Sequence, residues 1–312
     1  MPPGVCGQAS GAGAVSEPGG FGELLAGRVQ ERQSQIVLGI DPDPSKLWPA
    51  VVEASGVAAT AAAAVAAHCL ALIDAAGPAC VAVKPQLACF ERLGAPGREA
   101  LGEVCEAARD AGLLVIADGK RGDIDVSAAA YAASLFGGFD TPYGHVAGLG
   151  ADAATVNPYM GVDTLESFLS TSRPAGAGLF VLVRTSNPGA ADFEDLPTGD
   201  GALWERIASA VDRLGQVSGG LSDVGAVVGA TAPEHLGRAR ELMPTAVFLL
   251  PGVGAQGGDV EQLAPAFAPG KAGGLVTASR SIAQAGQERG IDPAEGARAE
   301  AERLRDLAWS LG

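Results

Sequence analysis

The fold is decided by residues 113–124, which read LLVIADGKRGDI. They begin with a near-continuous apolar run, which is typical of a parallel strand covered on both faces. The polar end of the run carries Asp118 and Lys120, and Asp123 lies three residues further along. Residues two apart in a strand point to the same face, so we expect Asp118 and Lys120 to face one site.

Seven more runs of this kind occur, at residues 35–41, 80–86, 153–159, 178–186, 224–231, 246–254 and 274–281. The helices predicted between and after the runs include residues 57–76, 98–111, 202–214 and 293–311. Eight strands that alternate with helices predict an α/β protein, a (β/α)8 TIM barrel, which commonly spans about 250 residues as one domain. We therefore expect a flexible N-terminal segment at residues 1–20 and a single catalytic barrel domain at 21–312. The alternative, a doubly wound open sheet, lacks a GxGxxG motif after its first strand.

Composition and charge narrow the class of protein. A hydrophobic share of 47% with 18% charged residues excludes a disordered chain. The net charge of −15 argues against nucleic acid or an anionic membrane as a partner. Five cysteines without a CxxC pair or a metal-ligand spacing indicate free thiols in a reducing compartment. Because neither a signal peptide nor a long uninterrupted apolar run is recognisable, we expect a cytoplasmic protein.

Polar and charged residues gather where the predicted strands end. They are Asp41, Lys84, Asp118, Lys120, Asn157, Ser186, Gly254 and Arg280. The carboxyl ends of the strands form the face of a barrel where active sites lie. A role in stability alone would not need charge at the same end of strand after strand, so the pattern predicts an active site.

The charges of Lys84, Asp118, Lys120 and Asp123 form a mixed array of two ammonium groups and two carboxylates. Opposite charges within about 4–6 Å favour the charged forms of both partners. A fixed ammonium group can stabilise a developing carbanion and deliver a proton, and a fixed carboxylate can lie against an anionic leaving group. The array therefore predicts acid–base chemistry on an anionic substrate.

A second feature predicts a phosphate site. Residues 252–258, GVGAQGG, follow the seventh run, and Ser279 and Arg280 follow the eighth. Glycines let backbone N–H groups approach an anion, and the loops after strands 7 and 8 are the usual phosphate cradle of this fold. Arg280 would add bidentate pairing to phosphate oxygens.

Seven ordered motifs resemble one known family. Residues 118–124, DGKRGDI, resemble the DxKxxDI signature of the orotidine 5′-phosphate decarboxylases, in their longer bacterial (type 2) group. The other six are GIDPDP at 39–44, VKPQLACFERLG at 83–94, VNPYMG at 156–161, RTSNPGAADFED at 184–195, PGVGAQGGD at 251–259 and SRSI at 279–282. The resemblance implies a TIM barrel that converts orotidine 5′-phosphate (OMP) into uridine 5′-phosphate (UMP), the last step of de novo pyrimidine nucleotide synthesis, with no cofactor and no metal.

The resemblance also assigns catalytic roles. Asp41 would hold the ribose hydroxyls, and Lys84 would bridge the ribose and Asp118. Asp118 would lie against the substrate carboxylate, while Lys120 would protonate C6 as CO2 leaves. Asp123 would reach into the neighbouring subunit's site, which makes the functional unit a homodimer.

The remaining substrate-binding residues follow from the same resemblance. Ile124 would accompany Asp123 into the neighbouring site, and Ser127 stands where many relatives have Thr. Ser186 would contact the pyrimidine ring. The phosphate would be held by Gln256 and Arg280, and the further substrate-binding residues are Gly257 and Ser279.

Three alternatives remain open from the residues. A metal-dependent sugar-phosphate decarboxylase or aldolase of the same barrel superfamily would need an acidic metal ligand near Lys84, whose charge would repel Mg²⁺. A Schiff-base aldolase would need a neutral lysine beside Asp residues that favour the charged form. A catalytically silent nucleotide-binding barrel would not need Asp118 to face an anionic ligand. The acidic residues at 192, 194 and 195 are interpreted as a solvated loop that could act as a lid.

Overall fold

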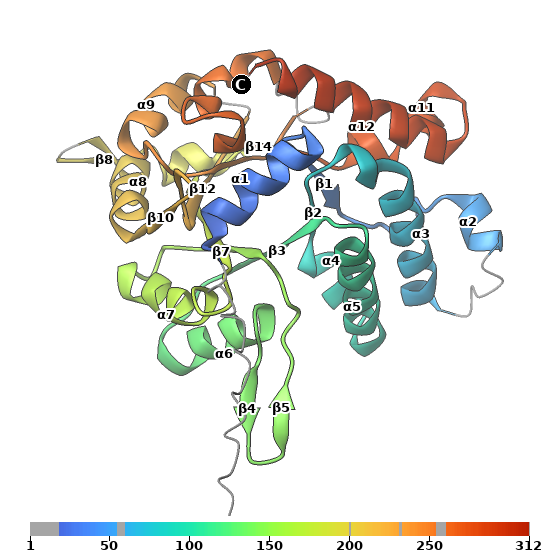
Figure 1. Ribbon diagram of the computed structural model, residues 1–312, viewed down its shortest axis with the longest axis horizontal. Coiled ribbons are helices and arrows are strands. Elements are labelled where there is room, and N and C mark those ends of the chain that lie inside the picture. The colour runs from blue at the N-terminus through green and yellow to red at the C-terminus, as the bar shows by residue number, and fades with distance from the viewer. Residues whose placement is uncertain (1–18, 55–59, 200, 231–232, 254–259, 312) are drawn as a thin grey trace, which may run out of the picture.

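A closed barrel of eight parallel strands lies at the centre of the molecule (Figure 1). The structure is a computed structural model and describes residues 19–54, 60–199, 201–230, 233–253 and 260–311. Around the barrel the order is β1-β2-β3-β6-β7-β12-β13-β14, and β14 pairs with β1 to close it. The predicted TIM barrel is confirmed, and the open sheet is excluded. Of the predicted N-terminal segment 1–20, residues 1–18 lie outside the described residues.

The barrel strands coincide with the eight predicted runs. They are β1 (Ile36–Ile40), β2 (Ala82–Pro85), β3 (Leu114–Arg121), β6 (Ala153–Val156), β7 (Gly178–Arg184), β12 (Val224–Val228), β13 (Phe248–Leu250) and β14 (Gly274–Ala278). The largest difference is at β13, which covers a third of its predicted run. Pro251 follows directly, and proline has no N–H with which to continue the ladder.

Helices surround the barrel. The four predicted ones are α3 (Ala61–Ala76), α5 (Ala95–Asp110), α8 (Leu203–Leu214) and α12 (Pro293–Trp309). The others are α1 (Phe21–Arg32), α2 (Pro49–Ala54), α4 (Leu87–Glu91), α6 (Asp125–Leu135), α7 (Val162–Ser172), α9 (Glu234–Leu242), α10 (Arg280–Ala283) and α11 (Ala285–Arg289), with 3-10 turns η1 (Gly77–Ala79), η2 (Pro188–Asp192), η3 (Val260–Phe267) and η4 (Lys271–Gly273). Asp292 caps α12 by accepting from the N–H groups of Ala294 and Glu295, and Pro293 takes the first helical position, where its missing N–H costs nothing.

Helix α3 has a composition that a membrane helix could share. By length and composition alone, Ala61–Ala79 could cross a bilayer. In the barrel this stretch packs against α5 and α12, and Val65, Cys69 and Leu72 on it are buried. Packing within the outer layer accounts for its apolar composition.

Helix α1 closes the amino-terminal end of the barrel and lies across its middle in Figure 1. Its residues Phe21, Leu25 and Val29 are buried in the cluster of side chains that fills the barrel interior. Phe21 packs edge-on against Phe180 of β7, with ring centroids 6.1 Å apart. With this end filled, a ligand can reach the interior from the carboxyl ends of the strands.

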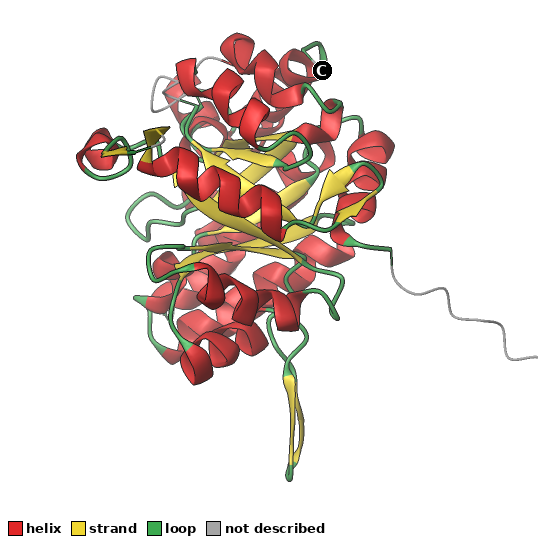
Figure 2. Ribbon diagram, turned by 90° about the vertical axis from the view of Figure 1, so that its left-hand side faces the viewer, coloured by secondary structure: helices red, strands yellow, loops and turns green. Residues whose placement is uncertain are grey.

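A hairpin between α6 and β6 projects far from the barrel (Figure 2). It consists of β4 (Phe139–Thr141) and β5 (Gly144–Val146), in which Phe139 pairs with Val146. Both of these side chains are about half exposed, and Tyr143 at the tip is 99% exposed. Two shorter hairpins are β8 (Pro197–Thr198) with β9 (Gly201–Ala202) and β10 (Val217–Ser218) with β11 (Leu221–Ser222). The sequence did not predict these hairpins.

Candidate active site

A cavity of about 510 Å³ opens at the carboxyl ends of the barrel strands. Seven of the predicted site residues line it: Asp41, Lys84, Asp118, Lys120, Ser186, Ser279 and Arg280. They come from five strands or the turns that follow them, so the barrel brings together residues that lie up to 239 positions apart (280 − 41). Gln256 and Gly257, predicted to bind the substrate, lie outside the described residues.

Asp118 is the centre of the polar network in this cavity. Lys84, on the neighbouring β2, donates to its Oδ2 atom, and Lys120 donates to its Oδ1 atom at 2.6 Å. Two further donors complete the set, the Thr155 hydroxyl at 2.8 Å and the Gln86 amide at 3.3 Å. Four donors around one carboxylate fix both its position and its charge.

The charges of Asp118 and Lys84 survive burial because each stabilises the other. Burial alone would raise the pKa of Asp118, but Lys84 and Lys120 outweigh it and lower the pKa from 3.8 to about 2. Burial alone would lower the pKa of Lys84, but Asp118 and Asp41 raise it above the usual value. At neutral pH the cavity therefore holds an ionised carboxylate beside a protonated lysine.

Lys120 reaches the cavity through an irregular backbone rather than through regular strand alternation. Its φ of 46° is in the left-handed region, which is uncommon for any residue except glycine. The register of β3 against β6 shifts between Ala117 and Arg121, and the Lys120 N–H donates to the Thr155 hydroxyl at 3.0 Å. The prediction that Asp118 and Lys120 face one site is confirmed, but its argument from alternation is wrong. A local kink held by Thr155 turns Lys120 toward the cavity.

Ser279 and Arg280 follow β14, which in the closed barrel is separated from β2 and its Lys84 by β1 alone. Ser279 precedes the first turn of α10, and Arg280 begins it with an exposed side chain. Gly252, after β13, also lines the cavity and has a φ of 102°, a conformation that favours glycine. An exposed cation beside a glycine turn is an arrangement that can hold a phosphate group.

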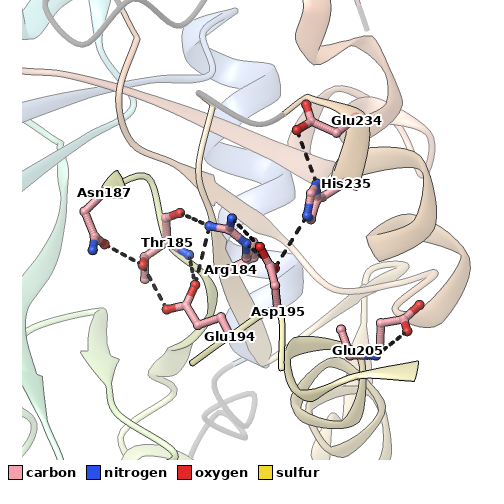
Figure 3. A network of polar contacts seen from close by, with 9 residues as sticks. Arg184, Thr185, Asn187, Glu194, Asp195, Glu205, Glu234 and His235 are labelled. Carbon is pink, nitrogen blue, oxygen red and sulfur yellow. Dashed lines mark hydrogen bonds and ion pairs between the residues drawn. The ribbon is translucent and has the colours of Figure 1, made fainter. Parts of the chain in front are cut away.

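We call residues 184–195 the β7 loop (Figure 3). Its residues from Thr185 to Glu194 contribute a further side of the cavity. Arg184 is 8% exposed and forms a bidentate ion pair with Asp195, at 2.8 and 2.9 Å. Glu194 accepts from both the N–H and the hydroxyl of Thr185. The interpretation of the acidic residues as a solvated loop is therefore wrong for Glu194 and Asp195, because the buried Arg184 needs a counter-charge. Asp192 is exposed, as expected.

The comparison with known proteins agrees with this geometry. The model of the "Orotidine 5'-phosphate decarboxylase / HUMPS family" matches residues 34–291, which is most of the chain. The chain belongs to this family. An orotidine 5′-phosphate decarboxylase of Deinococcus radiodurans is 43% identical over 297 residues, covering 94% of this chain and 98% of its own. One from Rhodopirellula baltica is 39% identical over 272 residues, covering 84% and 87%.

Solved structures give the same result. The OMP decarboxylase of Leishmania donovani superposes with a TM-score of 0.72 at 34% identity, covering 94% of this chain and 98% of its own. The UMP synthase of the same organism gives a TM-score of 0.74 at 35% identity, and this chain covers 56% of that longer protein.

Three residues that the decarboxylase family resemblance assigned to the substrate do not line the cavity. Asp123 follows β3 and accepts the N–H of Ile124 at 2.9 Å. Ile124 is 53% exposed, and Ser127 is exposed on the first turn of α6. Within one copy of the chain, these residues lie outside the cavity that holds Asp118.

Several cavity residues were not predicted. Thr155 and Gln86 both bind Asp118, and Thr277 contributes a buried hydroxyl that has no hydrogen-bond partner among the described residues. A lone Thr within an apolar strand is the one sequence signal for Thr155 and Thr277, and it is weak. Among the described residues, no group of three or more His, Cys, Asp or Glu side chains is arranged to hold a metal ion.

Proposed function

We propose that this member of the family is an orotidine 5′-phosphate decarboxylase, a carbon–carbon lyase that converts OMP into UMP without a cofactor. The observation that carries the proposal is Asp118, an ionised, 3% exposed carboxylate fixed between Lys84 and Lys120. A binding site for an anionic nucleotide has no use for a buried negative charge. A decarboxylase has one, because that charge destabilises a substrate carboxylate held beside it and favours its departure as CO2.

The chemistry follows from the positions of these charges. The C6–carboxylate bond breaks, CO2 leaves, and the electron pair of the bond stays on C6. The Lys120 ammonium stabilises this developing carbanion and then transfers a proton to it, which gives UMP. Lys120 afterwards recovers a proton from solvent, to which its 44% exposed side chain has access.

The remaining contacts position the substrate. Asp41 and Lys84 are proposed to hold the ribose hydroxyls, and Ser186 the pyrimidine ring. Arg280 and Ser279 are proposed to bind the phosphate, together with Gln256 and Gly257. Binding energy gained at the distant phosphate offsets the repulsion between the substrate carboxylate and Asp118.

Lys84 argues against the sugar-phosphate alternative. A metal-dependent reaction at this cavity would place a divalent cation near Asp118, where the Lys84 ammonium already binds the carboxylate. Two cations would then compete for one carboxylate, and their repulsion disfavours the metal. The same contact argues against a Schiff base at Lys84, because Asp118 and Asp41 raise the pKa of that lysine and favour its charged form.

We further propose a cytoplasmic homodimer in which Asp123 and Ile124, with Ser127 beside them, complete the neighbouring copy's site. The exposure of this region supports the proposal. Ile124 is 53% and Val126 83% exposed, and the projecting hairpin carries the exposed Tyr143. Exposed apolar side chains of this size are typical of an interface between subunits.

The experiment is the ultraviolet absorbance of OMP mixed with the purified protein, with and without EDTA. Loss of the orotate band with formation of UMP, unaffected by the chelator, would support the proposed reaction. Absence of turnover by a folded dimer would contradict it, and turnover that EDTA abolishes would favour the metal-dependent branch. Light scattering after gel filtration tests the dimer, with a monomer contradicting it.

A further inference from the structure

The β7 loop contributes several residues to the cavity wall that have no role assigned so far. Seven of the residues that line the cavity lie between Thr185 and Glu194. Ser186 is the one residue among them with a proposed contact to the substrate. Next to Ser186, Arg184 is paired with Asp195 and Thr185 with Glu194. These contacts must have a function in the cavity wall.

The two ends of the loop are joined by Arg184 and Asp195. Arg184 donates from Nε and Nη2 to the two carboxylate oxygens of Asp195, and its Nη1 donates to the carbonyl oxygen of Thr185 at 2.8 Å. A bidentate guanidinium–carboxylate pair fixes direction as well as distance. The backbone that leads into Ser186 is therefore held from the preceding strand.

Glu194 holds the same backbone from the cavity side. Its Oε2 accepts the N–H of Thr185 at 2.8 Å, and its Oε1 accepts the Thr185 hydroxyl at 2.9 Å (Figure 3). A carboxylate on the wall of a cavity for an anionic nucleotide would repel the ligand. The hydrogen bonds from Thr185 and the Arg184 guanidinium 3.7 Å away stabilise the negative charge of Glu194 at this position.

Contacts from outside the loop complete its support. The N–H of Trp204 donates to the carbonyl oxygen of Glu194 at 2.9 Å, and the N–H of Gly229 donates to that of Arg184 at 2.7 Å. A Cβ atom on Gly229 would lie 2.7 Å from the Cα atom of Ser186, so the close approach requires glycine. The backbone of Arg184 and Thr185, which leads into Ser186, is thus held by several contacts, and Gly229 packs directly against Ser186.

We propose that Asp195, acting through Arg184, and Glu194, acting through Thr185, are positioning residues that hold Ser186 where it meets the base of the substrate. This inference rests on the proposed function, which supplies the substrate. A preformed wall contributes equally to the binding of substrate and product. Its loss therefore raises KM and the Kd of UMP, and changes kcat much less.

The test uses Asp195→Asn and Thr185→Val, which remove the ion pair and the hydroxyl donor to Glu194 respectively. Thr185→Ser keeps that donor, and Asp192→Asn changes an exposed carboxylate of the same loop, so these two serve as matched controls. We expect Asp195→Asn to raise KM for OMP and the Kd of UMP at least tenfold, while kcat falls less than threefold. Thr185→Val should raise both at least threefold, and the two controls should stay within twofold of the wild type.

A merely structural role gives a different result. It would lower the folded fraction, and with it the apparent kcat, at an unchanged KM, and that outcome would overturn the proposal. If Asp195→Asn does not fold, Thr185→Val decides, because it breaks no ion pair. Two assays separate the two proposals. Absence of OMP turnover by the wild type in the absorbance assay refutes the proposed function. A Kd for UMP, measured by calorimetric titration, that Thr185→Val leaves unchanged refutes the positioning role.

Discussion

Replacing Asp118 by asparagine removes the charge on which the site is centred. The amide has nearly the shape of the carboxylate, but Lys84 and Lys120 donate to different oxygens of Asp118, and in asparagine one of these two positions carries an NH2 group that cannot accept. Lys84 is 6% exposed and would lose its principal counter-charge. Removal of one partner from a buried ion pair costs about 3–5 kcal/mol, so we expect the free energy of unfolding at pH 7 to fall by that amount.

The dependence of this loss on pH follows from the pKa of Asp118. Its value in the folded protein is about 2, against 3.8 for the free side chain. That difference corresponds to roughly 2 kcal/mol of stability. Because the folded-state pKa is depressed, this contribution is fully present above the unfolded-state value and is lost as the pH falls toward the folded-state value. The difference in stability between wild type and Asp118→Asn should therefore be about 1 kcal/mol smaller at pH 3 than at pH 7.

Urea unfolding at fixed pH values between 3 and 7, followed by circular dichroism, measures both quantities. Asp212→Asn removes the same charge from an exposed position of α8 and controls for the change in net charge. A loss below about 1 kcal/mol at pH 7 would show that Lys84 is not held by Asp118, since surface ion pairs contribute that little. A loss that is independent of pH would contradict the depressed pKa.

Three further predictions concern turnover and binding. Lys120→Ala should abolish turnover, measured by absorbance. It should change the free energy of unfolding by less than about 1 kcal/mol, because the Lys120 side chain is 44% exposed. A larger loss of stability would show that Lys120 is needed for folding and would contradict this prediction. Arg280→Ala should raise the Kd of UMP roughly 10- to 100-fold by calorimetry, since a charge-assisted contact of about 1.5–3 kcal/mol is removed; wild-type affinity would exclude Arg280 from the phosphate site. Gly229→Ala should raise KM for OMP several-fold, because its methyl group would displace Ser186; an unchanged KM would show that the β7 loop adapts freely.

The barrel could be predicted from the sequence because its strands are buried on both faces. Parallel strands under a layer of helices have near-continuous apolar runs, as in β7 with GLFVLV ahead of Arg184. The same topology places the ends of all runs at one face, so Lys84 and Arg280 could be assigned to one site before their contacts were known. Element order alone was sufficient for this step.

Contacts between distant segments could not be predicted in this way. Helix α1 fills the end of the barrel through Phe21 and Phe180, which lie 159 positions apart (180 − 21). The kink at Lys120 depends on the Thr155 hydroxyl of the neighbouring strand. Neither contact leaves a local periodic pattern, because each depends on a partner that the fold alone brings close.

The ion pair of the β7 loop could have been predicted from the sequence by a rule that was not applied. An arginine at the end of a buried apolar strand needs a counter-charge, because an unpaired buried charge is very costly. Arg184 stands at such a position, and Asp195 supplies the carboxylate from the returning loop. Lys84 at the end of β2 has the same requirement, and Asp118 meets it.

Lys84, Arg184, Lys120 and Arg280 at this face differ in burial. Lys84 and Arg184 are buried, each beside a carboxylate that holds it in place. Lys84 also lines the cavity, whereas Arg184 supports the β7 loop, seven residues of which line it. Lys120 and Arg280 are exposed and line the cavity. The substrate brings two anionic groups, a carboxylate at the pyrimidine and a distant phosphate. In the proposed reaction Lys120 acts at C6 and Arg280 at the phosphate. Substitution of either exposed cation should therefore impair turnover or binding with little effect on folding, whereas substitution of buried Lys84 or Arg184 should impair folding as well.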